Sequence, residues 1–219
     1  IQARSVETFQ AFGFAERIIA EAYRITEMAF WKPDPADPSR IIRSARTLDD
    51  PAGISEFPHL IVNQARVLDY FAEFMANAPT RMKPDYGYEF VRLEVTEGEY
   101  PVTVTLAHTA GPDAGTERTV RAKYVVGADG ARSRVRDSIG CTMAGDKANH
   151  AWGVMDVLAN TDFPDIRTKC AITSGSGGSI LLIPREGGHL FRMYVDLGVV
   201  PENDAGAVRN TSIDQIIAK

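Results

Sequence analysis

The sequence lacks the features that define several special classes of protein. Its two cysteines, Cys141 and Cys170, are too few for a disulfide-stabilised scaffold and are typical of the reducing cytoplasm. No segment approaches the roughly 18 consecutive apolar residues of a transmembrane helix, so no membrane association is expected. Acidic residues outnumber basic ones by 29 to 24, which argues against a nucleic-acid-binding protein with a basic face. No metal site is predicted.

Repeats of about 20 to 50 residues and low-complexity tracts are also missing, which argues against a solenoid or a disordered chain. What remains is an average globular composition, with 44% apolar and 24% charged residues in a chain of 219. This length is enough for one large domain or two small ones. Because the chain starts at Ile1 rather than methionine and ends at Lys219 within a helical pattern, we expect it to be a piece of a longer protein.

Helices and strands are both predicted. Helical spacing of apolar residues, with Ser5, Asn63 and Ser212 as caps, predicts helices over residues 5–12, 15–22, 63–78, 131–139 and 212–219. Alternation of apolar and polar residues predicts strands over residues 25–31, 41–45, 90–96, 102–108, 119–126, 151–158, 169–173, 179–183 and 190–197. The strands between 90 and 126 are expected to form an antiparallel meander. The helix after Asn63 is expected to bury Val67, Leu68, Phe71, Phe74 and Met75.

One segment combines a strand, a sharp turn and a basic helix. Residues 124–136 read Tyr-Val-Val-Gly-Ala-Asp-Gly-Ala-Arg-Ser-Arg-Val-Arg, in which a strand leads into Asp129 and Gly130. Glycine allows a ligand to approach the backbone closely, and the free N–H groups of a helix start favour an anion such as phosphate. An ordinary strand-to-helix turn, followed by a solvated basic helix, explains the same pattern.

This segment resembles the Asp-Gly motif of the class A flavoprotein aromatic hydroxylases, the family of para-hydroxybenzoate hydroxylase and phenol hydroxylase. In that family the motif lies beside the pyrophosphate and ribose of FAD and also affects the use of NADPH. Residues 63–66 resemble a helix start of the family that contacts the flavin through its glutamine. The resemblance implies these cofactor-binding residues: Arg4, Gln64, Asp129, Gly130, Ser133, Arg136 and Arg185.

A second stretch, residues 180–194, resembles the substrate-domain strands of the phenol hydroxylase and 3-hydroxybenzoate 4-hydroxylase subgroup. In that subgroup a tyrosine at the place of Tyr194 reaches the phenolic oxygen of the substrate, and arginines at the places of Arg185 and Arg192 lie near flavin and substrate. The two-residue period of a strand puts Arg192 and Tyr194 on one face. Without the family resemblance, this polar face would be expected to meet water.

Two further residues bias the implied substrate toward an aromatic acid. His59 matches a histidine that contacts the substrate hydroxyl in 3-hydroxybenzoate 4-hydroxylase, and Lys169 matches a lysine that faces its carboxylate. A carboxylate that leaves water needs a paired cation, whereas a neutral phenol would leave a buried lysine unpaired. Each residue also fits an ordinary role, His59 as a hydrogen-bonded structural histidine and Lys169 as a surface lysine at a strand edge.

The resemblance implies an FAD-dependent monooxygenase that converts 3-hydroxybenzoate to 3,4-dihydroxybenzoate with NADPH or NADH and O2, through a flavin C4a-hydroperoxide. Tyr194 and His59 would be catalytic, and His59, Lys169, Arg192 and Tyr194 would bind the substrate. Two alternatives stay open: a phenol 2-monooxygenase that acts on neutral phenols, and a non-catalytic ligand-binding fragment. The piece by itself is expected to be inactive, because the Gly-x-Gly-x-x-Gly turn of the family is not among its residues.

The expected fold class is α/β and α+β. It combines part of a GR2-type FAD-binding fold that includes the β-meander with a substrate domain built on a mixed or antiparallel sheet. Residues 1–23 and 61–147 are expected in the FAD-binding part, and residues 24–60 and 148–219 in the substrate-binding part. An incomplete cofactor domain would expose an apolar edge, which a homodimer would cover.

Overall fold

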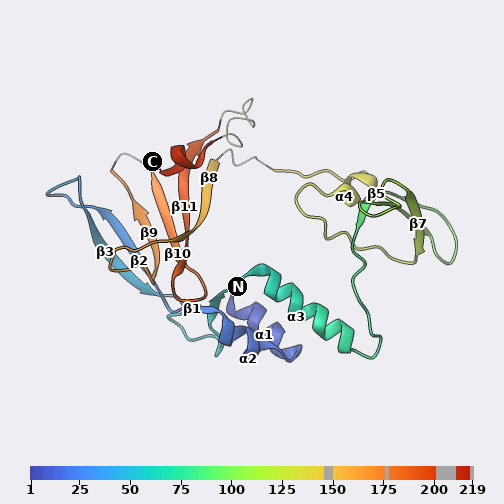
Figure 1. The fold of residues 1–219 in the computed structure, drawn as a ribbon, viewed down its shortest axis with the longest axis horizontal. Coiled ribbons are helices and arrows are strands. Elements are labelled where there is room, and N and C mark those ends of the chain that lie inside the picture. The colour runs from blue at the N-terminus through green and yellow to red at the C-terminus, as the bar shows by residue number, and fades with distance from the viewer. Residues whose placement is uncertain (146–149, 176–177, 201–210, 218–219) are drawn as a thin grey trace. The chain divides into compact units, whose positions relative to one another are not determined.

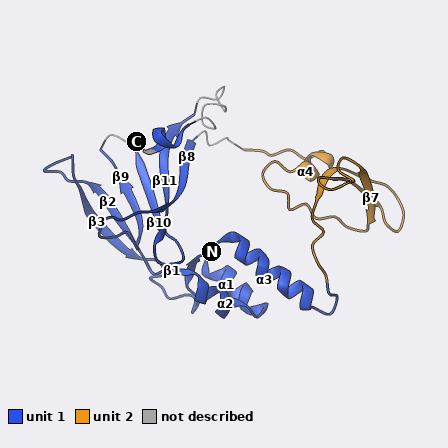
Figure 2. Cartoon of the chain, viewed as in Figure 1, with its two compact units in different colours: residues 1–81, 148–219 blue, residues 82–147 orange. Residues whose placement is uncertain are grey.

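A computed structural model describes residues 1–145, 150–175, 178–200 and 211–217 of the chain (Figure 1). The chain divides into two compact units, one formed by residues 1–81 and 148–219 and the other by residues 82–147 (Figure 2). The expected division into a cofactor part and a substrate part concerns the ligands and stays a prediction.

A six-stranded sheet in the order β3-β2-β9-β10-β11-β8 forms much of the first unit. Its strands are β2 (Glu27–Pro33), β3 (Ile41–Leu48), β8 (His150–Leu158), β9 (Lys169–Thr173), β10 (Ser179–Pro184) and β11 (Leu190–Val199). Neighbouring strands are antiparallel except β2 and β9, which run parallel. The sheet is therefore mixed, as the sequence allowed.

The apolar face of this sheet forms one of the cores of the first unit. Ala29, Cys170, Leu182 and Phe191 come from four different strands and are between 0 and 5% exposed. The alternating residues of β10 and β11 point to the opposite face, because side chains along a strand alternate between the two sides of a sheet. The sheet thus separates a dry core from a polar face that is free to form a site.

A second core joins three helices to a two-stranded ribbon. The elements are α1 (Ala3–Ala11), α2 (Ala15–Glu21), α3 (Gln64–Asn77), β1 (Tyr23–Ile25) and β4 (His59–Ile61). Val6, Ile18 and Leu60 are fully buried there. The ring of Phe14 stacks on Tyr70 with centroids 5.3 Å apart, and this aromatic contact fixes α3 against the loop between α1 and α2.

Helix α3 begins as expected, but the side that it buries differs from the prediction. The side chain of Asn63 caps the helix by accepting a hydrogen bond from the Ala65 backbone at 3.0 Å. Val67 and Phe71 pack against the core, yet Leu68 is 62% exposed and the fully buried helix residue is Tyr70. Helical spacing defines a stripe, but the stacking on Phe14 decides which edge of that stripe turns inward.

The predicted capping of the first helix by Ser5 is wrong. The helix starts at Ala3 with Gln2 as its N-cap residue, and no side chain caps it. Before the helix, the amino nitrogen of Ile1 donates a hydrogen bond to the backbone oxygen of Leu60 at 2.6 Å. This contact ties the residue before the N-cap to β4, and Ser5 falls within the first turn of the helix.

The second unit is the expected antiparallel meander with one short helix. Its strands are β5 (Tyr88–Val95), β6 (Val102–His108) and β7 (Glu117–Ala122), paired in chain order. The predicted strand to residue 126 ends early, because Ala122 pairs with Val102, the first residue of β6. Beyond that point no strand residue remains to pair with, and Tyr124 is 89% exposed.

One predicted helix is shorter than expected, and another begins as predicted. The helix expected over residues 131–139 is the five-residue α4 (Arg134–Ser138), which begins after Ser133 as its cap. The last helix is α6 (Ile213–Ile217), and the hydroxyl of Ser212 accepts from the Gln215 backbone at 3.2 Å, as predicted. Residues 218 and 219 of that prediction lie outside the described residues.

Candidate functional site

A cavity of about 860 Å³ lies in the first unit, between the helices and the polar face of the sheet. Its volume is within the range of small-molecule sites. Helix α1 and the segment from β4 to the start of α3 form one wall, while β8, β10 and β11 form the other. Four predicted site residues line it: Gln64, Arg185, Arg192 and Tyr194.

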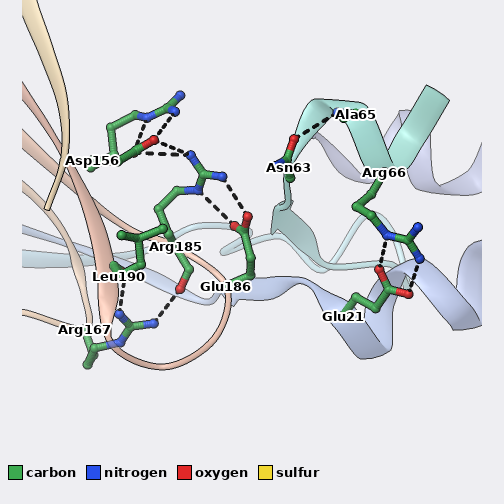
Figure 3. Close-up of polar contacts among 10 residues, drawn as sticks. Glu21, Asn63, Ala65, Arg66, Asp156, Arg167, Arg185, Glu186 and Leu190 are labelled. Carbon is green, nitrogen blue, oxygen red and sulfur yellow. Dashed lines mark hydrogen bonds and ion pairs between the residues drawn. The ribbon is translucent and has the colours of Figure 1, made fainter. Parts of the chain in front are cut away.

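The helix side of the cavity presents the start of α3. Gln64 is the first residue of this helix, and both it and the capping Asn63 line the cavity. Arg66 ties the helix to α2 through two hydrogen bonds of 2.8 Å to Glu21 (Figure 3). Hydrogen bonds from Arg66 and Tyr70 lower the pKa of Glu21 to about 2. The start of α3 is thus held in a fixed place at the cavity edge.

The sheet side presents residues of β11 and β8 that face the cavity because of strand alternation. Arg192 and Tyr194 line the cavity, while Phe191, the neighbour of Arg192 on β11, is buried on the opposite face of the sheet. Arg192 pairs with Asp156 of β8, and Tyr194 pairs with Val154. The expected orientation of Arg192 and Tyr194 to one face is therefore confirmed.

Two arginines and two carboxylates form a connected cluster on this wall (Figure 3). Arg192 makes a two-pronged contact with Asp156, from Nε and Nη2 at 2.8 Å each. Arg185 donates to Glu186 at 2.9 and 2.7 Å and contacts both oxygens of Asp156 at 3.3 Å. Paired guanidinium and carboxylate groups of this geometry are the stronger class of protein hydrogen bonds.

The cluster keeps all four groups charged. Hydrogen bonding from Arg192 is the largest cause that lowers the pKa of Asp156. Arg185 lowers the pKa of Glu186 in the same way, and Glu186 in turn raises the pKa of Arg185. Arg167 braces the β10–β11 turn from behind by donating to the backbone oxygens of Arg185 and Leu190 at 2.7 and 2.8 Å (Figure 3).

Lys169 lies on the same face of the sheet as Tyr194 but does not line the cavity. Its neighbour Cys170 pairs with Leu182 in the apolar core, so Lys169 points to the opposite, polar face. It sits at the start of β9, beside Met28 of β2. The structure brings Lys169 to the expected face, and its contact with a substrate stays a prediction.

His59 and Arg4 lie apart from the first cavity. Both line a second hollow of about 690 Å³ on the same unit. The His59 ring is mostly buried, and its Nδ1 lies 3.1 Å from each carboxylate oxygen of Asp49. The side chain of Arg4 is 91% exposed and pairs with Glu7 at 3.2 Å. The predicted roles of both residues stay predictions.

The Asp-Gly motif lies in the second unit and forms a compact turn. Asp129 accepts hydrogen bonds from the Ser133 hydroxyl at 2.5 Å and from the Val135 backbone at 3.2 Å. Both hydrogen bonds lower the pKa of Asp129, and the bond from Ser133 has the larger effect. Gly130 has φ of +79°, a conformation that favours glycine, so the sharp turn needs this residue.

The motif residues fit a group with phosphate or ribose oxygens. Among the described residues, Arg136 Nε is a buried side-chain nitrogen without a hydrogen-bond partner. Arg136 and Ser133 line a hollow of about 320 Å³ in the second unit. A donor that is buried without an acceptor is unfavourable unless a ligand or water completes it. The cofactor contact of Arg136 stays a prediction.

Sequence reasoning missed Asp156 and Glu186. A signal for the first was present, because Asp156 is the one charged residue in the apolar stretch from 151 to 158. A lone charge within such a strand indicates a polar face with a partner. For Glu186 there was no signal beyond its place next to Arg185. In the described part of the chain, no group of three or more potential ligands could hold a metal, and no helix could cross a membrane.

The chain is similar to known flavin-dependent proteins. The model of a family described as "FAD binding domain" matches residues 1–217. The chain is 51% identical to the 3-hydroxybenzoate 4-monooxygenase of Comamonas testosteroni over 220 residues, which are all of this chain and 34% of that enzyme. It is 31% identical to the phenol 2-monooxygenase fsqG of Aspergillus fumigatus, over 98% of this chain and 33% of that protein. The chain thus spans about a third of the length of these relatives.

Solved structures show the same fold. The p-nitrophenol 4-monooxygenase PnpA of Pseudomonas putida DLL-E4 matches with a TM-score of 0.72 and 19% identity, over 95% of this chain and 49% of that one. The flavin-dependent monooxygenase PieE, solved with FAD and substrate, matches with a TM-score of 0.69 and 23% identity, over all of this chain and 39% of that one.

Proposed function

Because the chain belongs to the FAD binding domain family, we propose that it is part of a flavin-dependent monooxygenase that hydroxylates 3-hydroxybenzoate to 3,4-dihydroxybenzoate. The observation that carries this proposal is the 51% identity to a 3-hydroxybenzoate 4-monooxygenase across the whole chain. The cavity adds a second line of support, because it presents Arg192 and Tyr194 on a strand of the sheet and Arg185 directly after the neighbouring strand. Rigid strands hold such groups more precisely than loops do.

In this proposal the residues of the chain bind, orient and shield the substrate. FAD, reduced by NADPH or NADH, supplies the activated oxygen when it is bound. Tyr194 donates or accepts a hydrogen bond at the phenolic oxygen and helps to remove its proton, which makes the ring carbon to be hydroxylated more electron-rich. His59 is the second group proposed to act at this hydroxyl, although it lines the second hollow and Tyr194 lines the first cavity. Arg192 supports Tyr194.

Lys169 is the proposed partner of the substrate carboxylate. It lies on the same sheet face as Tyr194, two strands away, because β10 lies between β9 and β11. An ammonium group at one end and a hydroxyl at the other would fix the orientation of the ring. Orientation matters because a rotated ring would present the wrong carbon, and small misplacements reduce rates strongly.

Seven residues are proposed to bind the cofactor. Gln64, Arg4 and Arg185 of the first unit would serve the flavin. Asp129, Gly130, Ser133 and Arg136 of the second would serve the pyrophosphate and ribose, where the unpartnered Nε of Arg136 is a suitable donor. In functional terms, residues 1–23 and 61–147 would be the cofactor part, and 24–60 and 148–219 the substrate part.

Other properties of the whole protein belong to the same proposal. The free thiols of Cys141 and Cys170 fit a cytoplasmic protein. A homodimer would cover apolar residues such as Tyr124 and Val126, which are 89% and 90% exposed. Neither nucleic acid nor membrane is a proposed partner. Residues 1–219 by themselves are proposed to lack catalytic activity.

One alternative substrate class has support of its own. The likeness to a phenol 2-monooxygenase favours a neutral phenol, and the charged groups of the cavity wall already neutralise one another. Oxygen uptake by the full-length protein with FAD and NADPH would separate the two substrates. We expect faster uptake and 3,4-dihydroxybenzoate formation with 3-hydroxybenzoate. Uptake with phenol but not with 3-hydroxybenzoate would overturn the proposal.

A further inference from the structure

We propose that Asp156 is a positioning and specificity-determining residue: it holds Arg192 beside Tyr194 and cancels the positive charge of the cavity wall, so that this wall receives the uncharged hydroxyl end of the substrate. The inference rests on the proposed function for the identity of the substrate. Its geometric part concerns this chain alone.

The first step of the argument is the connectivity of Asp156. Its carboxylate accepts from Arg192 at 2.8 Å through both oxygens and from Arg185 at 3.3 Å. Among the described residues, Asp156 is therefore the group that joins the two arginines. A carboxylate that binds two guanidinium groups holds each arginine side chain more firmly than a single ion pair would. The conformational entropy of the shared aspartate is lost only once for the two contacts.

The second step is the link from Arg192 to Tyr194. These residues are two apart on β11 and face the same cavity. Asp156 holds the guanidinium group of Arg192 on this face through two hydrogen bonds of 2.8 Å, and these bonds raise the pKa of Arg192. A free arginine has many rotamers, so without Asp156 the guanidinium would leave this place. Asp156 thus acts on Tyr194 through Arg192.

The third step is charge. Of the described side chains that line the cavity, three are charged: Asp156, Arg185 and Arg192. Glu186, which binds Arg185 at 2.7 Å, brings the cluster to zero net charge. A neutral cluster offers no net attraction to an aromatic carboxylate. Hence the carboxylate of the substrate binds elsewhere, and the hydroxyl is the end that meets Tyr194.

The test is a set of variants in the full-length protein with FAD bound, with benzoate and phenol as probes in isothermal titration calorimetry. Asp156→Asn keeps the size of the side chain and leaves one excess positive charge. We expect it to bind benzoate about tenfold more tightly, the effect of one unit charge a few ångströms away in a partly solvated cavity. Phenol binding should change less than about twofold, and the gain for benzoate should shrink at high salt.

Kinetics then separate positioning from a structural role. If the proposed substrate is right, Asp156→Asn lowers kcat for 3-hydroxybenzoate without raising KM, whereas Asp156→Glu restores the neutral wall and wild-type benzoate affinity. Glu16→Gln is the matched control, since it removes one acidic charge from the exposed surface of α2. It should leave both dissociation constants unchanged.

The outcomes are distinct from those of the proposed function. Unchanged or weaker benzoate binding by Asp156→Asn would overturn the role of Asp156, as would equal behaviour of the Asn and Glu variants. If Asp156→Asn does not fold, Glu186→Gln makes the same change in charge without removing the partner of Arg192. Unchanged benzoate affinity in that variant would overturn the charge argument. Lack of turnover with 3-hydroxybenzoate would sink the proposed function and leave the binding result standing.

Discussion

Replacement of Asp165 by alanine should destabilise the first unit strongly. Asp165 lies in the loop before β9, is 1% exposed, and is the acceptor for three side chains from β2 and β3. Trp31 Nε1 donates to it at 2.9 Å, Arg43 donates twice at 2.7 Å, and Arg46 donates at 3.0 Å. The carboxylate thus fastens the edge strand β3 to the loop before β9.

The magnitude follows from what the truncation leaves behind. Removal of one partner from a buried ion pair costs about 3 to 5 kcal/mol. Arg43 and Arg46 are 37% and 45% exposed and are able to turn toward water, so we expect the lower end, about 3 kcal/mol. For a unit of this size, each kcal/mol corresponds to roughly 2 to 4 °C, so the melting temperature should fall by about 6 to 12 °C.

Thermal unfolding followed by tryptophan fluorescence suits this test, because the two tryptophans of the chain, Trp31 and Trp152, both lie in the six-stranded sheet. Asp162→Ala is the control, since Asp162 is an exposed acid in the same loop and should change stability by less than about 0.5 kcal/mol. Equal melting temperatures for Asp165→Ala and Asp162→Ala would refute the idea that Asp165 fastens the sheet edge.

The pH dependence of this effect has a defined sign. Burial opposes the ionised form of Asp165, but hydrogen bonds from Arg43, Arg46 and Trp31 prevail and lower its pKa. A lowered pKa in the folded state stabilises the protein above the unfolded value of about 4, and this stability is lost as the pH falls below it. The difference between wild type and Asp165→Asn should therefore be full at pH 7 and shrink in acid.

Three further predictions concern other sites. Lys169→Ala should raise KM for 3-hydroxybenzoate at least tenfold in the full-length enzyme, because the substrate carboxylate loses its cationic partner. The effect on kcat should be smaller, and unchanged steady-state kinetics would contradict this role. Gly127→Ala should destabilise the second unit by about 1 to 3 kcal/mol in denaturant titrations, because the Cβ of the new alanine would lie 2.8 Å from the side chain of Val135. Unchanged stability would show that the structure relaxes around this contact. Burial raises the pKa of Cys170 to about 12, so this thiol stays protonated and unreactive at pH 8. A thiol reagent should therefore modify only the exposed Cys141. Rapid modification of two thiols in the native protein would refute this prediction.

Much of the fold was predictable because its signals are local. Alternation of apolar and polar residues was enough to find the meander of β5, β6 and β7. Asn63 and Ser212 correctly predicted the starts of α3 and α6, because a capping side chain bonds to the backbone of its own helix. The errors lie where a distant partner decides, as when β6 ends the pairing of β7 at Ala122 or when Phe14 selects the buried side of α3.

The candidate site was predictable in the same uneven way. Arg192 and Tyr194 on one face of β11 follow from the period of a strand, and Gln64 follows from the start of a helix. That these residues share one cavity with Arg185 is a property of the tertiary structure. A hydrogen-bonded His59 was one of the two expectations for this residue, but its partner Asp49 was not predictable, because it depends on the packing of the loop after β3.

The sequence by itself determined the family and the chemical character of each segment, since residue types and their spacing are local properties. Only the tertiary structure decided which charges meet. Asp156 and Arg192 are 36 residues apart and lie opposite each other through the register of β8 and β11. That register is fixed by the burial of one whole face of the sheet, and a shift of one residue would turn every side chain to the wrong side. Long-range packing of this kind leaves no mark on the spacing of residues along either strand.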